Sequence, residues 1–206
     1  IGIAHWYNII IPVIYFLIPA GLVLLQPDLG TTLILFGVCV SYLFISGIRK
    51  RHILIGLLIF IILGLWGWNN FLEDYQRERI IGLFQPSYDP LGINYSVIQS
   101  KIAIGSAGFL GKGFQQGAQV QLGFLPEPAT DFIFAAFTEE WGLLGALLLI
   151  SAFGLLVFRI IKIGINSENN FAKLVSLGAI IVFLLHFTFN IGSNVGLLPV
   201  IGLPFP

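Results

Sequence analysis

The sequence predicts an all-α protein: a polytopic transmembrane helical bundle with a long structured loop outside the membrane. Three observations support this fold class. Hydrophobic residues make up 57% of the chain and charged residues only 10%, whereas roughly a quarter of an ordinary soluble domain is charged. Five apolar segments approach the ~20 residues that a helix needs to cross a bilayer. One connection between them is much longer than a plain turn.

The composition also excludes several classes of protein. Ten basic and ten acidic residues give a net charge of zero, so we expect no nucleic-acid partner. The single cysteine, Cys39, excludes a disulfide framework, and the three scattered histidines lack the spacing of a zinc site. Because the chain contains no Met and stops within a patterned stretch, we expect an internal fragment of a longer membrane protein.

The five spans are expected at about residues 7–25, 29–48, 53–72, 141–158 and 174–191. Short loops rich in Lys and Arg stay in the cytoplasm. Arg49–His52 follows the second span, and Arg159, Lys162 and Lys173 follow the fourth. Alternation then places three segments outside: the turn at Asp28, residues 73–140, and the tail 192–206. At Asp28 we favour a turn cap over a ligand.

The long outer loop, residues 73–140, has aromatic and apolar patches that disordered segments lack. We expect a short helix at 99–104, tight glycine-rich bends at 105–108 and 111–113, and an extended entry at 124–128 into the next helix. Either Thr130 or Asp131 is expected as the N-cap of that helix. The loop is therefore expected to form a structured platform on the outer membrane surface.

Asp131 is the first candidate for catalysis, because it stands at the mouth of an apolar helix. Apolar neighbours and lipid raise the pKa of a carboxylate, and a carboxylate closer to neutrality suits a general base. The alternative is an N-cap aspartate, which spacing alone favours.

Glu139 and Glu140 follow two turns later. They lie about 80° and 180° round the helix from Asp131, at about 100° per residue, so the three cannot share a face. At least one should point into protein, since a bare charge in lipid costs several kcal/mol. A functional role and packing against a basic side chain of the loop are equally good interpretations.

Charges of both signs occur on the platform, at Glu127, Lys101, Lys112, Arg77 and Arg79. Lys and Arg beside glycine-rich backbone can hold a phosphate or pyrophosphate. Lys112, within Gly-Lys-Gly, is the main candidate, although surface lysines are usually only solvated.

Histidine and asparagine also occur within the fifth span, at His186 and Asn190. For these we favour satisfied hydrogen bonds over a proton relay.

Several motifs in order resemble the SEDS family of shape, elongation, division and sporulation proteins (RodA, FtsW and SpoVE). They are Q-P-D-L-G-T at 26–31, Q-S-K-I-A-I-G-S at 99–106, L-P-E-P-A-T-D-F-I-F-A at 125–135, E-E-W-G at 139–142, and N-I-G with G-L-L-P at 190–199. Lys101, Gly111–Gly113 and Gln119–Leu122 are more similar to the RodA branch. Ala107 and Ala118 are small departures. The family is expected to have ten spans, and this chain resembles spans five to nine.

The resemblance implies a peptidoglycan glycosyltransferase that polymerises lipid II, a disaccharide-pentapeptide on undecaprenyl pyrophosphate. The polymerisation is expected to occur at the outer face of the membrane during the elongation of rod-shaped cells. It implies a multi-pass protein of the bacterial plasma membrane, partnered by membrane lipids and by a class B penicillin-binding protein. The family's essential acid falls on Asp131, as general base. Candidate substrate-binding residues are Glu127, Lys112, Lys101, Arg77, Arg79, Gln119 and Glu139.

The leaving pyrophosphate needs positive charge, either from a divalent cation (Mg²⁺ or Mn²⁺) or from Lys and Arg. Two rival functions stay open: a flippase or transporter of the lipid-linked precursor, and a membrane scaffold for a transpeptidase. A transporter should place its substrate site near the membrane midplane, whereas the polar candidates here lie at the outer rim.

Overall fold

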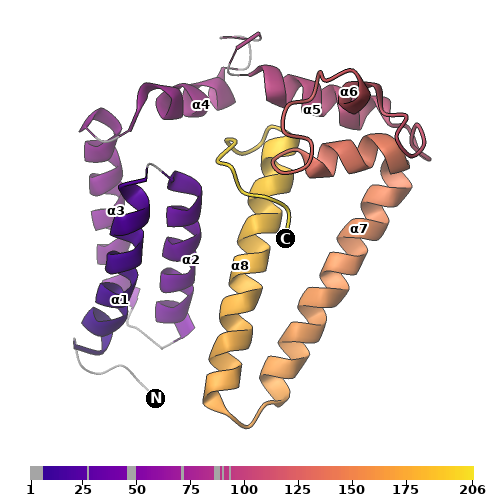
Figure 1. Cartoon of the computed structure of the whole chain (residues 1–206). Helices are drawn as coiled ribbons and strands as arrows, with labels where there is room; N and C mark the ends of the chain where they lie inside the picture. Colours follow the sequence, from indigo (N-terminus) through magenta and orange to yellow (C-terminus); the bar gives the residue numbers. More distant parts are fainter. Residues whose placement is uncertain are drawn as a thin grey trace. The chain divides into compact units, whose positions relative to one another are not determined.

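The computed structural model describes residues 7–26, 28–45, 50–70, 72–85, 89, 91–92 and 94–206. Arg49, from the first basic loop, and residues 46–48 of the second expected span lie outside the described residues. All regular structure in the described part is helical (Figure 1). The helices are α1 (Tyr7–Leu24), α2 (Leu29–Ile45), α3 (Lys50–Asn70), α4 (Asp74–Phe84), α5 (Tyr95–Ser106), α6 (Ala118–Gln121), α7 (Ile133–Asn166) and α8 (Asn170–Asn194).

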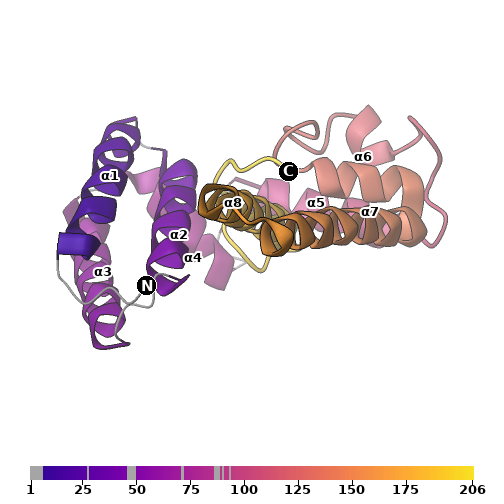
Figure 2. The ribbon, with the colours of Figure 1, turned by 90° about the horizontal axis from the view of Figure 1, so that it is seen from below.

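The chain divides into two compact units, Ile1–Glu78 and Arg79–Pro206. In the first unit, α1 and α2 lie side by side (Figures 1 and 2). Asp28 begins α2 as expected: its carboxylate accepts hydrogen bonds from the Thr31 N–H at 3.0 Å and the Thr31 hydroxyl at 2.6 Å. The preferred interpretation of Asp28 as a cap is therefore confirmed, because both carboxylate oxygens are used by the first turn of the helix.

In the second unit, α7 and α8 pack against each other and are joined by a short turn (Figure 1). These two are the helices in the described part that are both long and apolar enough to cross a membrane, and shorter apolar helices cover Val13–Leu24 and Leu29–Phe44. The helix that contains the expected fourth span begins eight residues earlier than the span, at Ile133. The expected outer helix at 99–104 lies within α5, while α4 was not predicted.

A break at Gly142 divides α7 (Figure 1). Gly142 has φ 70° and ψ −172°, a conformation that glycine alone adopts readily. Residues 143–166 beyond the break span about 36 Å at about 1.5 Å per residue, which suffices for a bilayer core of about 30 Å. Residues 133–141 change direction and lie with α5 and α6 at one end of this unit, so the platform includes the first part of α7.

The glycine-rich bend after α5 fits into this break. The Leu143 and Leu144 N–H groups donate to the carbonyls of Gly108 and Phe109 at 3.0 and 3.1 Å. In return, Lys112 and Gly113 donate to the carbonyls of Glu139 and Glu140, both at 3.0 Å. The bend thus satisfies backbone groups that the broken helix frees. Its close approach requires two glycines, because a Cβ on Gly111 or Gly142 would collide with the backbone opposite.

A small apolar core lies beneath the platform. Ala103, Leu125, Phe132 and Ala135 are buried together there, so α5, the loop before α7 and the first turn of α7 share one packed interior. The aromatic rings of Phe153, Phe187 and Phe205 pack on one another and join α7, α8 and the C-terminal tail. The burial of Phe132 and Ala135 in the core fixes the start of α7, where the candidate site lies.

Candidate functional site

Asp131 lies in a turn that precedes α7, formed around Glu127. The N–H groups of Thr130 and Phe132 donate to the Glu127 carbonyl at 3.3 and 3.2 Å, and Glu127 itself has a φ of 45°. The N-cap of α7 is Phe132, with no side-chain cap bond from its own turn. The expectation that Thr130 or Asp131 caps this helix is therefore wrong, and the Asp131 carboxylate is not used as a local cap.

The cap comes from α8 instead. The Asn194 side-chain oxygen accepts a hydrogen bond from the Ala135 N–H at 3.0 Å, and its amide nitrogen donates to the Asp131 carbonyl at 2.8 Å. The Asn190 amide donates to the same Asp131 carbonyl at 3.0 Å and to the Leu203 carbonyl at 3.0 Å. Both asparagines are buried, at 1% and 0% exposure. The backbone of Asp131 is thus held from the far helix while its side chain stays outside this network.

The Asp131 carboxylate is half-buried, and nothing in the described part of the chain donates a hydrogen bond to it. Burial raises the pKa of Asp131 above its usual range; the charge of Arg79 opposes this rise, and the charge of Glu127 adds to it. Arg79 is anchored nearby by a 2.9 Å hydrogen bond to the Val200 carbonyl. The result is an accessible carboxylate with an increased affinity for protons, which is the property a general base needs.

Glu139 is fully buried, with 0% exposure. Its Oε1 lies 2.7 Å from Lys112 Nζ and also accepts a hydrogen bond from the Gln119 N–H at 3.1 Å. Lys112 Nζ also donates to the Ser106 hydroxyl at 2.8 Å. The expectation that one acid points into protein is thus confirmed, and its partner is a basic side chain of the loop. A phosphate at Lys112 would have to compete with this ion pair, and Glu139 offers no surface to a substrate.

The other predicted residues are spread over the two units. Lys101 is exposed on α5 and lies against Gly196, and Glu140 accepts a bond from the Gln115 N–H at 3.1 Å. The side-chain oxygen of Gln119 is buried. Arg77 forms a 3.2 Å ion pair with Asp74 in the first unit. Of the candidates, Arg79 and Glu127 lie close enough to Asp131 for their charges to shift its pKa. Lys112 and Gln119 both contact Glu139.

His186 and Asn190 of α8 both bond to backbone carbonyls, the interpretation preferred over a relay, although the Asn190 side-chain oxygen is buried without a hydrogen-bond partner in the described structure. The His186 ring nitrogen Nδ1 lies 3.0 Å from the Pro204 carbonyl oxygen, and Asn190 bonds as described above. Each side chain ties α8 to the C-terminal tail.

The carboxylates at the turn are ligands of the type that a divalent cation such as Mg²⁺ takes. No group of three His, Cys, Asp or Glu side chains within the described ranges could enclose a metal. Mg²⁺, however, is usually bound by one or two carboxylates together with substrate phosphates and water. Glu127 and Asp131 supply two carboxylates at this turn, a donor set that such a cation accepts.

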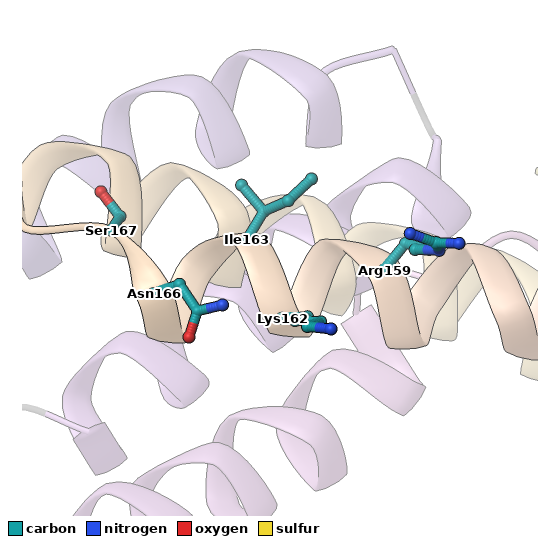
Figure 3. A pocket seen from close by; sticks show the side chains of 5 residues that line it. All are labelled: Arg159, Lys162, Ile163, Asn166 and Ser167. Carbon is teal, nitrogen blue, oxygen red and sulfur yellow. The ribbon is translucent and has the colours of Figure 1, made fainter.

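A concave surface lies at the end of α7 opposite to Asp131 (Figure 3). It measures about 460 Å³ and is lined by Arg159, Lys162, Ile163, Asn166 and Ser167. Both basic residues are exposed, and neither is held by a buried partner in the described structure. This hollow belongs to the basic loop that predicts the orientation of the chain, and it contributes nothing to the Asp131 turn.

Sequence reasoning missed the residues that support the site. Asn194 and Ser100 are fully buried, and the Ser100 hydroxyl donates to the Asn194 carbonyl at 2.8 Å. One signal was available: Asn190 and Asn194 are four residues apart near the end of an apolar helix, so they share a face. Amides placed in this way in a membrane helix usually face protein.

Comparisons with known proteins agree on one family. Residues 3–206 match the model of the FtsW/RodA/SpoVE family, described as a cell cycle protein. The chain is 41% identical over 198 residues to the peptidoglycan glycosyltransferase MrdB of Escherichia coli K12, covering 95% of this chain and 53% of that protein. It is 36% identical over 190 residues to the stage V sporulation protein E of Bacillus subtilis, covering 90% and 50%.

A solved structure is also similar, with a TM-score of 0.78 and 33% identity. It comes from work on the structural coordination of polymerization and crosslinking by a peptidoglycan synthase complex, and the match covers 100% of this chain and 56% of the other. The chain therefore spans about half the length of the curated relatives it matches.

Proposed function

Because the chain belongs to the FtsW/RodA/SpoVE family of cell cycle proteins, we propose that it carries the catalytic acid of a peptidoglycan glycosyltransferase. The substrate is lipid II, and the reaction extends a glycan strand at the outer face of the bacterial plasma membrane. The relatives at about 41% identity that bear this activity in their names support the reaction class. The RodA-like motifs at Lys101, Gly111–Gly113 and Gln119–Leu122 favour a role in cell elongation.

One observation carries the proposal: the half-buried carboxylate of Asp131 has a raised pKa and is not used as a helix cap. In the reaction, this carboxylate accepts the proton of the acceptor sugar's 4-hydroxyl. The resulting oxygen attacks the anomeric carbon of the donor, and the bond to the lipid pyrophosphate breaks. A single displacement inverts an α-linked donor to a β-linked product, so no second carboxylate is needed as a nucleophile.

Positive charge near the leaving pyrophosphate lowers the barrier by stabilising the charge that develops there. Arg79 supplies such a charge close to Asp131. A Mg²⁺ or Mn²⁺ ion that arrives with the pyrophosphate, facing Glu127 and Asp131, would add Lewis-acid stabilisation. Lys112, whose charge is balanced by Glu139, supports the platform instead.

The position of the polar chemistry favours an enzyme over a transporter. Transporters place their substrate site near the membrane midplane, whereas Asp131, Glu127 and Arg79 all precede the spanning part of α7. Crosslinking of the product requires a transpeptidase, and we propose a class B penicillin-binding protein as partner. The similar structure from a peptidoglycan synthase complex supports such a partner.

The test is lipid II polymerisation by the intact, full-length protein with Asp131→Asn. The substitution keeps the shape of the side chain but cannot accept a proton, so the rate should fall 10²–10⁴-fold, as is typical for loss of a general base. Expression and folding should be unchanged, because the helix cap comes from Asn194. Wild-type glycan synthesis by the Asn variant would refute the catalytic assignment.

A further inference from the structure

The two buried asparagines of α8 form hydrogen bonds with the backbone at the start of α7. Asn194 binds both the carbonyl of Asp131 and the N–H of Ala135, so one side chain spans the junction between the turn and the helix. Its amide nitrogen also donates to the Asn190 carbonyl at 2.7 Å. Its own backbone carbonyl accepts the hydroxyl of Ser100 from α5. Three helices therefore meet at Asn194.

We infer that Asn194 is a positioning residue for Asp131: through the Asp131 carbonyl, it fixes where the carboxylate lies and how far water reaches it. This inference rests on the proposed role of Asp131 as general base. Asn190 assists by binding the same carbonyl and by tying it to the C-terminal tail at Leu203.

Geometry supports a positioning role over a simple cap. A cap needs only an acceptor for the N–H groups of the first turn, and the Asn194 oxygen meets that need at Ala135. The two amide nitrogens directed at the single carbonyl of Asp131 add nothing to the cap. Each amide nitrogen already donates its other N–H to a second carbonyl, of Leu203 for Asn190 and of Asn190 for Asn194, so displacing the Asp131 carbonyl would leave one buried N–H on each side chain without an acceptor.

The carboxylate responds to this position. Its raised pKa arises mainly from burial, with Arg79 on α4 and Glu127 in the preceding turn as the charged groups that act on it. If the turn is released from α8, the carboxylate gains water. Its pKa should then fall towards the usual value of about 3.9, and the geometry for proton transfer should worsen.

The experiment compares Asn194→Ala with Ser193→Ala in the intact protein, in detergent or nanodiscs. Ser193 is a matched control, because it is buried in the same turn of α8 and its hydroxyl donates within α8, to the Asn190 carbonyl at 2.9 Å. Both variants lose a buried hydrogen-bonding side chain, but only Asn194→Ala releases Asp131. Rates are expressed per folded molecule, so a loss of folded protein does not imitate a loss of catalysis.

For Asn194→Ala we expect kcat/KM to fall on the order of a hundredfold, because a small misplacement of a reacting group can reduce the rate by this factor. The acid limb of its pH profile should move to lower pH. For Ser193→Ala, kcat/KM and the acid limb of the pH profile should match those of the wild type. A ¹³C-carboxylate titration of Asp131, assigned by its loss in Asp131→Asn, should show the same downward shift without any activity measurement.

An unchanged kcat/KM and an unchanged Asp131 titration in Asn194→Ala would overturn the inference. If Asn194→Ala does not fold, Asn190→Ala replaces it, since it removes the second donor and leaves the cap at Ala135 intact; a smaller shift in the same direction is expected. Failure of both to fold while Ser193→Ala folds normally would show a purely structural role. Full activity of Asp131→Asn would refute the proposed function alone, and the titration would still decide the role of Asn194.

Discussion

The two parts of α7 on either side of Gly142 differ in which side chains they bury and which they expose. In residues 133–141 the buried side chains include Phe134, Ala135, Thr138 and Glu139, and Glu139 binds Lys112 and the Gln119 N–H from outside the helix. In residues 143–158 the large exposed side chains are leucine, isoleucine and phenylalanine, with Leu148 64% exposed and Leu155 65% exposed. The break at Gly142 changes the direction of the helix. The first part can therefore pack in the platform while the second part faces lipid.

The same comparison applies to the two acids of this region. Glu139 is neutralised by Lys112 inside the platform, whereas Asp131 is accessible and has only the more distant charge of Arg79 opposing the rise of its pKa. An acid with a bound cation stabilises a structure, and an acid without one is available for proton transfer. The ion pair with Lys112 thus separates the buried Glu139 from Asp131, the proposed general base.

Lys112→Ala should produce the largest change in stability. It leaves the buried Glu139 carboxylate without its cation, which costs about 3–5 kcal/mol for a buried pair broken on one side. The loss should appear as a lower thermal midpoint of the intact protein in detergent. The double variant Lys112→Met with Glu139→Gln, which removes both charges, should recover most of it. A stable Lys112→Ala with only a raised KM for lipid II would instead support the phosphate-binding role predicted from the Gly-Lys-Gly motif.

Gly142→Ala should have the next largest effect, because it tests the break itself. A side chain at φ 70° is strained, at about 1–3 kcal/mol, and the new Cβ would meet the backbone of the bend at Gly111. Gly154→Ala is the matched control within the apolar part: Gly154 is helical, and a Cβ added there would meet open space, so alanine should stabilise it by about 0.5–1 kcal/mol. Equal thermal midpoints for the two variants would show that the break does not constrain the fold.

The sequence predicts structure best where a feature depends only on neighbouring residues, as an apolar helix or a helix cap does. Apolar runs predicted the long apolar helices but not the polar α4, and Asp28 was correctly expected to cap α2. Asp131 was correctly placed at the mouth of a helix, but its cap was misassigned, because the true cap comes from Asn194, 63 residues away in the chain. The partner of Lys112 was not identified either, since the close approach of the bend to Glu139 depends on the break at Gly142. Contacts between distant residues leave no periodic pattern, so local reasoning identifies candidate residues but not their partners.

The smallest expected effect is the dependence of stability on the charge of Asp131. A folded-state pKa above the unfolded value means that the folded protein binds this proton more tightly. The resulting stabilisation is fully present below the unfolded pKa of about 3.9 and is lost as pH rises through the raised folded pKa. Asp131→Asn does not titrate, so it should lack this component.

We therefore expect the thermal midpoint of the wild-type protein to fall relative to that of Asp131→Asn as pH rises across this window, and the difference to stay constant above it. The effect should be small, because the carboxylate is only half-buried and water screens its charge. Kinetics should run in the opposite direction: polymerisation by the wild type should rise with pH over the same window, since only the ionised carboxylate accepts a proton. A midpoint difference that does not change with pH, together with a flat acid limb of the rate, would show that Asp131 is neither perturbed by its surroundings nor used as a base.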